Sequence, residues 1–343
     1  KKIAVVKVNS RDRDLYHMTS FVFNDKMELL RSAQANIVME DRTTQLGEMV
    51  IDNEGTLVFT RFHRTFNDNI SKASLLYQRL GEDGLMEYPL YFEGSWLDDI
   101  RLKVDNVTKR YILSSFYTKE RRGVIEGYYF LVFDKNAAKA AIERTVIFLD
   151  DLRQEAKGNA TSKSAFNDYF IRQVITRRDG GFLIGSEAYY TTSRANNWNR
   201  WDYLYGSPFM GLNNMYYMSP YSSRLWWGNF PRTSQAVRYH ADNIMIQSYS
   251  SNGELEWSKV ITKSQFDDES DELLSFQLMI AGGEIHVLFN QQERRDKMLN
   301  PGLKNLDAGH QFMPARGKQV SSRILIVPTV YRGYICFAKL EYN

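Results

Sequence analysis

The sequence is informative first in what it lacks. It contains a single cysteine, Cys336, which excludes an intramolecular disulfide and a cysteine-based zinc site. Cys336 lies in the apolar run Tyr334 to Phe337, where a small buried side chain is its expected role. The five histidines are scattered, with no pair at the spacing of metal ligands. We therefore expect neither a metal nor any other cofactor.

Motifs of catalysis are also missing. The chain has no Gly-x-Ser-x-Gly elbow, no Walker loop and no Gly-x-Gly-x-x-Gly fingerprint. The carboxylate pairs Asp98-Asp99, Asp150-Asp151 and Asp267-Asp268 fall at predicted turns, where aspartate is common for backbone reasons. We assign no catalytic residue and expect a protein that is not an enzyme. The alternative is a propeller that cleaves glycans with two carboxylates, whose separation the sequence does not give.

Excess charge and long apolar runs are lacking as well. Forty-four Lys and Arg stand against 41 Asp and Glu, a net charge of +3 that is too weak to indicate nucleic-acid binding. No apolar run approaches the ~20 residues of a membrane-spanning helix. The chain begins at Lys1-Lys2-Ile3, without Met or a signal peptide and directly in a strand-like run, so we expect an N-terminal portion to be missing.

What the chain does have is alternation. Short runs rich in β-branched and aromatic residues come in pairs around tight turns, such as Asn53-Glu54-Gly55 and Asn252-Gly253. Two kinds of hairpin alternate along the chain, as an inner and an outer hairpin do in a four-stranded blade. The sequence therefore predicts an all-β chain that forms a β-propeller of four-stranded antiparallel blades. A β-sandwich is the alternative fold, although it would not require this alternation.

The expected organisation is a single propeller domain over 1–343. About five units are recognisable in it: a partial first unit through Ile37, then Gln45 to Phe92, Asp98 to Asp150, Asp168 to Ile261, and Leu273 to the C-terminus.

Two insertions interrupt the pattern. The polar insertion, 291–322, is predicted to be a long surface loop. The other insertion, 190–239, holds thirteen aromatic residues. A long aromatic loop either folds into a satellite core or forms a binding surface, because interface hot spots favour Trp, Tyr and Arg. We predict partner binding by its central part; sugar stacking stays open, and the cations are too few for nucleic acid. The predicted partner-binding residues are Trp198, Trp201, Tyr203, Tyr205, Phe209, Tyr216, Tyr217, Tyr221, Trp226, Trp227 and Phe230.

Several segments of the chain are short strand, turn and strand-end elements with distinctive residues. The clearest runs from Asn243 to Ile261, with an Asn-Gly turn and Trp257 in its second strand. The others are Lys263-Ser264-Gln265, Val287 to Asn290, Ser114 to Tyr117 with Ile125 to Tyr128, and Asp179 to Phe182 with Gly185-Ser186-Glu187.

Together these segments resemble a group of mostly uncharacterised Bacteroidota envelope proteins with propeller folds. Two positions depart from that group's pattern: Gln291 stands where it has Asp, and Ser115 where it has Gly. The resemblance implies export, and hence a periplasmic or outer-membrane-associated location. It also implies a non-enzymatic scaffold or plug that binds proteins of an outer-membrane complex, such as the type 9 secretion translocon, without itself crossing the membrane.

Overall fold

The computed structural model describes residues 1–9, 14–65, 68–157, 164–193, 237–268, 270–291 and 311–342. Strands make up 60% of these residues and helix 4%. The prediction of an all-β chain with almost no helix is confirmed.

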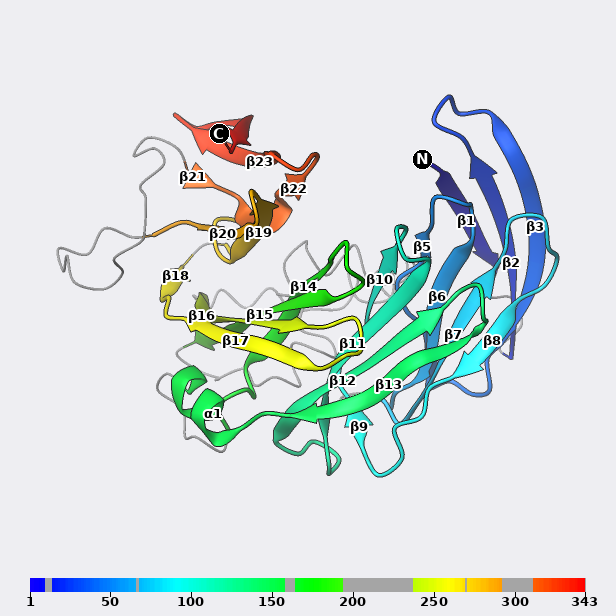
Figure 1. The fold of residues 1–343 in the computed structure, drawn as a ribbon, viewed down its shortest axis with the longest axis horizontal. Helices are drawn as coiled ribbons and strands as arrows, with labels where there is room; N and C mark the ends of the chain where they lie inside the picture. The colour runs from blue at the N-terminus through cyan, green and yellow to red at the C-terminus, as the bar shows by residue number, and fades with distance from the viewer. Residues whose placement is uncertain are drawn as a thin grey trace.

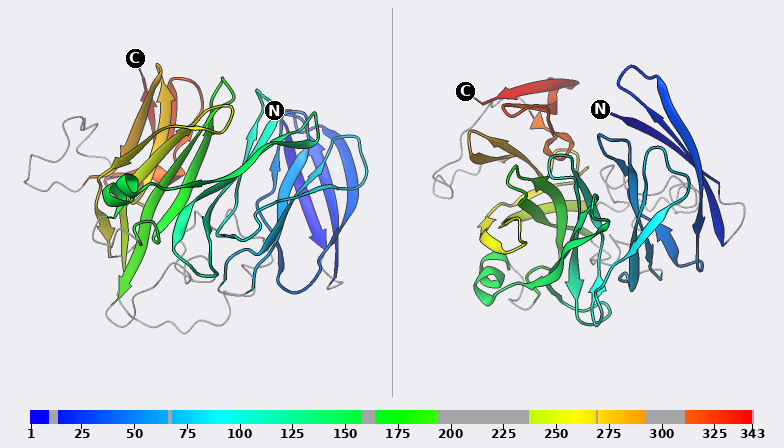
Figure 2. Two further views of the ribbon diagram at one scale, coloured as in Figure 1. Left: turned by 60° about the horizontal axis from the view of Figure 1, so that its bottom comes forward. Right: turned by 45° about the vertical axis from the view of Figure 1, so that its right-hand side comes forward.

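The sheets are antiparallel and follow one another in chain order around a common axis, which is the arrangement of a β-propeller (Figure 1). Figure 2 shows from two other sides that they stand next to one another like blades. Three sheets have four strand positions each, and in each of these sheets one position is divided between two strands. They consist of β4 (Thr44–Leu46), β5 (Val50–Ile51), β6 (Leu57–His63), β7 (Lys72–Gln78) and β8 (Met86–Pro89); of β9 (Trp96–Leu97), β10 (Arg101–Asp105), β11 (Arg110–Thr118), β12 (Ile125–Asp134) and β13 (Lys139–Ile147); and of β14 (Tyr169–Thr176), β15 (Phe182–Ser193), β16 (Val237–Tyr249), β17 (Leu255–Ile261) and β18 (Gln265–Asp267).

The remaining sheets have fewer strand positions in the described part of the chain. The first consists of β1 (Ile3–Asn9), β2 (Leu15–Phe23) and β3 (Leu29–Val38). The residues from Leu273 onward form two sheets: β19 (Phe276–Ala281) with β20 (Glu284–Phe289), and β21 (Gln311–Phe312), β22 (Lys318–Gln319), β23 (Ile324–Tyr331) and β24 (Tyr334–Glu341). A 3-10 turn, Pro314–Arg316, lies between β21 and β22.

One short helix, α1 (Asp150–Ala156), follows β13. The sequence analysis placed Asp150 and Asp151 at a turn, whereas the structure places both in the first turn of this helix. Carboxylates are favourable there because they face the positive end of the helix dipole.

The core lies between successive sheets, because side chains along each strand point alternately to its two neighbours. In β19, Leu278 packs with Ile246 of the preceding sheet, and Met279 packs with Val327 of the following one. Each inner sheet is thus covered on both faces, which a two-sheet sandwich would not provide. The propeller is confirmed over the sandwich.

The first and last sheets have no such neighbour on one face within the described residues, and they flank the open side of the arc in Figure 1. On β1, Ile3 and Val5 are 42% and 51% exposed, and on β24 Phe337 is 74% exposed. Cys336 on β24 is half-buried. The expectation of a buried cysteine is therefore wrong, because β24 is an edge strand that packs on one side only.

Candidate functional site: the stem of the aromatic insertion

All eleven aromatic residues predicted to bind a partner lie within 194–236, outside the residues that the structure describes. The structure does describe the two strands that carry this segment. β15 and β16 are the longest strands among the described residues, and they stay paired from Phe182↔Tyr249 to Ser193↔Val237. The ends of the predicted insertion are therefore strand, and we call the paired part of β15 and β16 next to it the stem.

One side of the stem is an aromatic stack. The ring of Tyr190 lies flat against that of His240, with centroids 4.5 Å apart. The Tyr190 hydroxyl donates to Asp242 at 2.8 Å, and Nε2 of His240 lies 3.1 Å from the Thr192 hydroxyl. Burial lowers the pKa of His240, and the charge of Arg238 acts in the same direction. The imidazole is thus neutral at physiological pH, so the stack holds the stem without adding charge to it.

The other side of the stem is braced by β18, which pairs with β16 from Tyr239↔Asp267 to Ala241↔Gln265. Arg238 donates to both carboxylate oxygens of Asp268, at 2.6 and 2.9 Å, and its guanidinium lies 4.5 Å from the centre of the Phe266 ring. This contact holds the pKa of Asp268 below its usual value. Both charges are about half exposed, so the pair contributes little stability and serves mainly to fix the side of the stem.

A buried ion pair lies at the base of the stem. Nζ of Lys263 is 2.8 Å from Oε1 of Glu187, and the two side chains are 1% and 0% exposed. The amine also donates to the carbonyl of Ala241 and to Oε1 of Gln265, both at 2.6 Å. Burial lowers the pKa of Lys263, and the charge of Glu187 opposes that effect. The amine therefore depends on this carboxylate to remain charged.

The second carboxylate oxygen of Glu187 links the stem to β14 and to the segment before β19. It accepts from the Ser275 hydroxyl at 2.6 Å and from Nε of Arg172 at 3.2 Å. The Arg172 guanidinium in turn lies 4.8 Å from the centre of the Tyr189 ring, and the Tyr189 hydroxyl donates to Asp271 at 3.0 Å. The base of the stem is thus tied to β14 and to the segment before β19.

This network joins segments that the sequence analysis recorded only for their resemblance to a family of propellers. Gly185-Ser186-Glu187 supplies the carboxylate, Lys263-Ser264-Gln265 supplies the amine, and Gln265 donates onward to the carbonyl of Asn290. Tyr128, from another of these segments, donates to Ser186 at 2.9 Å. The segments are therefore structural. The sequence analysis missed Glu187 and Lys263 as partners, and the available signal was Glu187, a charged residue inside the otherwise uncharged strand β15.

The aspartate pairs considered for catalysis are engaged in local structure. Asp98 accepts from Asn69 at 2.9 Å, Asp99 lies 3.2 Å from Arg101, and Asp267 accepts from the backbone of Ser270 at 3.0 Å. Within the described ranges, no group of three His, Cys, Asp or Glu side chains is placed to hold a metal ion. In the same part of the chain, no helix is long and apolar enough to cross a membrane.

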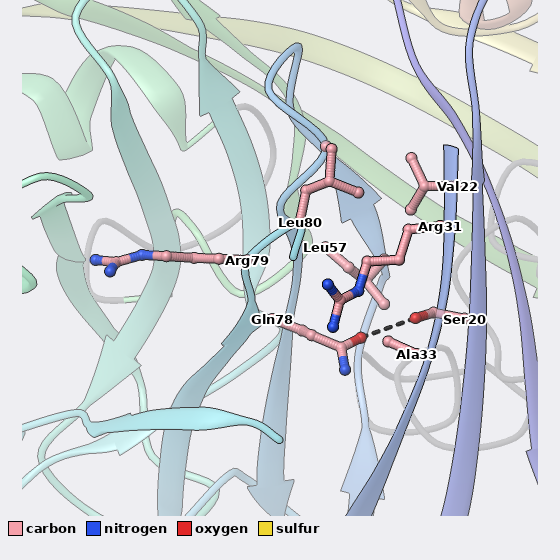
Figure 3. A pocket seen from close by; sticks show the side chains of 9 residues that line it. Ser20, Val22, Arg31, Ala33, Leu57, Gln78, Arg79 and Leu80 are labelled. Atoms are coloured by element: carbon pink, nitrogen blue, oxygen red, sulfur yellow. Dashed lines mark hydrogen bonds between the residues drawn. The ribbon is translucent and has the colours of Figure 1, made fainter. Parts of the chain in front are cut away.

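A small cavity between the first two sheets is lined by Arg31, Gln78 and Leu80 among others (Figure 3). Ser20 donates to Gln78 there at 2.8 Å. The cavity measures about 10 Å³, which is room for about one water molecule at most. It is a packing gap between blades and too small for a substrate.

Comparisons with known proteins found likenesses between this chain and solved structures at low identity. No family model and no curated protein matches it. A mutant of the Synechocystis apocarotenoid oxygenase aligns with 100% of this chain and 58% of its own, at 8% identity and a TM-score of 0.39. The Dos1 propeller aligns over 95% and 75% of the two chains, at 8% identity and a TM-score of 0.35. A DUF4221 member from Bacteroides vulgatus aligns over 97% and 77%, at 9% identity and a TM-score of 0.29.

The chain thus spans little more than half the length of the first of these structures. At such low identity and TM-score, these structures do not indicate the activity of this chain. The class of protein, a β-propeller, is defined by the strand order and by the packing between sheets.

Proposed function

We propose that this chain is a non-enzymatic protein-binding propeller, and that it docks through the aromatic insertion on the β15–β16 stem. The observation that carries the proposal is the anchoring of that stem by the buried pair of Glu187 and Lys263. A rigid base reduces the ordering cost that a long loop pays when it binds. The aromatic and arginine content of 194–236 is that of an interface hot spot.

The cellular setting is part of the same proposal. The resemblance of the strand and turn segments to Bacteroidota envelope propellers supports an exported protein, periplasmic or associated with the outer membrane. In that setting the chain acts as a scaffold or plug subunit of an outer-membrane complex, of which the type 9 secretion translocon is an example.

The test replaces Trp226 and Trp227 together with Ser. We expect the variant to lose partners that co-purify with the wild type from the native envelope, with little change in melting temperature. Trp257→Ser is the matched control, because Trp257 is 40% exposed on β17 and lies outside the insertion. It should keep the partner.

Two results would contradict the proposal. A large fall in melting temperature with partner binding retained would make the insertion a satellite core. Binding or hydrolysis of a glycan panel by wild type, lost in the double variant, would favour the carbohydrate-binding or glycan-cleaving alternative.

A further inference from the structure

The last sheet, which stands at one end of the arc in Figure 1, ends one strand position earlier than the four-position sheets. β21 and β22 share one edge of β23, as β4 and β5 share one edge of β6, so they hold the inner position. β24 pairs along the whole of the other edge, from Ile324↔Glu341 to Tyr331↔Tyr334. Among the described residues no strand pairs with the far edge of β24, where β8 and β13 lie in the second and third sheets.

The backbone of β24 presents hydrogen-bonding groups along this far edge. The amide of Tyr342 donates to the carbonyl of Arg323 at 2.9 Å, which makes these two residues a hydrogen-bonded pair. Because the direction of backbone groups alternates along a strand, the even-numbered residues of β24 point their amides and carbonyls to β23. Those of Ile335, Phe337 and Lys339 point outward, so the edge can take one more strand by antiparallel pairing.

The edge of β24 lacks the features that usually protect an exposed strand, which are bulges, prolines, shortness and charge. The outermost strands of the first four sheets have such features: β3, β13 and β17 each join their neighbour with a register shift, and β8 is four residues long and ends at Pro89. β24 pairs over eight residues without a shift and contains no proline. Its two charged residues, Lys339 and Glu341, lie near its end and pair with each other at 2.8 Å. The apolar half of the edge, around Ile335 and Phe337, is therefore open to pairing.

We propose that this edge pairs with the same edge of a second copy of the chain, in an antiparallel β24–β24 dimer whose two-fold axis passes at Phe337. Each β24 then takes the fourth strand position of the other copy's last sheet. In this register Phe337 lies opposite Phe337 of the second copy, and Ile335 lies opposite the aliphatic part of Lys339. Cross-strand pairs of aromatic residues stabilise a sheet, whereas an axis at Lys339 or Glu341 would set like charges directly opposite each other. The side chains of β24 are thus complementary to themselves.

The dimer is a further property of the chain and does not depend on the aromatic insertion. Ile335 and Phe337 are 70% and 74% exposed in the single chain, and pairing covers part of both side chains. One strand from each copy makes a small contact beside the ~800 Å² per partner of a standard interface. We therefore expect a reversible, concentration-dependent dimer.

The first test is sedimentation of charge variants at Phe337. The wild type should pass from monomer to dimer as its concentration rises from about 1 to about 500 μM. Phe337→Lys and Phe337→Glu should each stay monomeric, because like charges would face each other across the axis, whereas an equimolar mixture of the two should dimerise again. Val107→Lys is the control: Val107 is as exposed as Ile335 but lies in the turn between β10 and β11, so this variant should dimerise as the wild type does.

The second test is amide hydrogen exchange along β24, which separates its two directions. The amides of Ile335, Phe337 and Lys339 should exchange rapidly in dilute protein and about tenfold or more slowly in the dimer. Those of Cys336 and Ala338, which point to β23, should be slow at both concentrations.

Three results would overturn the proposal. The first is a wild type that stays monomeric over the whole concentration range. The second is a Phe337→Lys variant that dimerises as the wild type does, or a mixture with Phe337→Glu that does not dimerise. The third is slow exchange of the Phe337 amide in dilute monomer, because another strand of the same chain would then occupy the fourth position.

Discussion

Nζ of Lys263 and Oε1 of Glu187 lie 2.8 Å apart at the base of the β15–β16 stem, and both side chains are removed from solvent. A buried pair of this kind is costly to break, because the remaining charge keeps its desolvation penalty and loses its attraction. The stem therefore depends on both residues being present.

Lys263→Met should lower the free energy of unfolding by about 3–5 kcal/mol, measured by urea denaturation. The matched control is Lys339→Met, since Nζ of Lys339 is also 2.8 Å from its partner Glu341 but its side chain is 55% exposed. That variant should change stability by less than about 1 kcal/mol. Equal effects of the two substitutions would show that burial is not what makes the stem pair important.

Gly127 should not tolerate a side chain. A Cβ atom at this position of β12 would lie 1.9 Å from the carbonyl oxygen of Val146 on β13, so the two strands would have to separate. We expect Gly127→Ala to cost about 3 kcal/mol or more in thermal or chemical unfolding. Gly185→Ala is the control, because its Cβ would meet the flexible end of Leu278 at 3.1 Å. A Gly127→Ala variant as stable as Gly185→Ala would contradict the close approach of β12 and β13 at this position.

Glu48 should make stability fall as the pH rises. Burial raises its pKa to about 7 in the folded state, from 4.5 in the reference state. Between these values the folded protein holds a proton that the unfolded chain has lost, so stability falls from pH 4.5 to 7 and is level outside that window. Glu48→Gln should match the wild type near pH 4 and exceed it at pH 8, by on the order of 1–3 kcal/mol in denaturant titrations.

The pKa of Glu54 is shifted in the direction opposite to that of Glu48. Its hydrogen bonds from Lys109 and Lys135 lower its pKa from 4.5 to about 2. The stabilisation is complete above pH 4.5 and is lost as the pH falls through 2, so Glu54→Gln should be less stable than the wild type at pH 7. If Glu48→Gln and Glu54→Gln both raised, or both lowered, the free energy of unfolding at pH 8, the surroundings that we assign to the two carboxylates would be wrong.

The exposed face of β24 should tolerate polar substitution. Phe337 is 74% exposed, so Phe337→Ser should change the melting temperature little and reduce self-association in sedimentation experiments. Phe59→Ser provides the contrast, because Phe59 is fully buried between the first two sheets and its replacement should unfold the protein. A large loss of stability in Phe337→Ser would mean that this face is covered in solution.

Local patterns in the sequence determined the strands and their hairpins. Alternation of side chains follows from strand geometry, and a turn such as Asn53-Glu54-Gly55 is recognisable because Gly55 adopts a φ of 93°, which other residues rarely accept. The same local signals did not reveal that the chain from Leu273 onward forms two sheets, because β21 and β22 are two residues long. They also did not reveal α1, a single short helix after β13.

What only the tertiary structure decided is which charged residues meet. Glu187 lies on β15 and Lys263 between β17 and β18, and their pairing depends on the register of β15, β16 and β18, which long-range packing fixes. Periodicity records the face on which a residue lies, whereas the charge that it meets there depends on how all the sheets pack together.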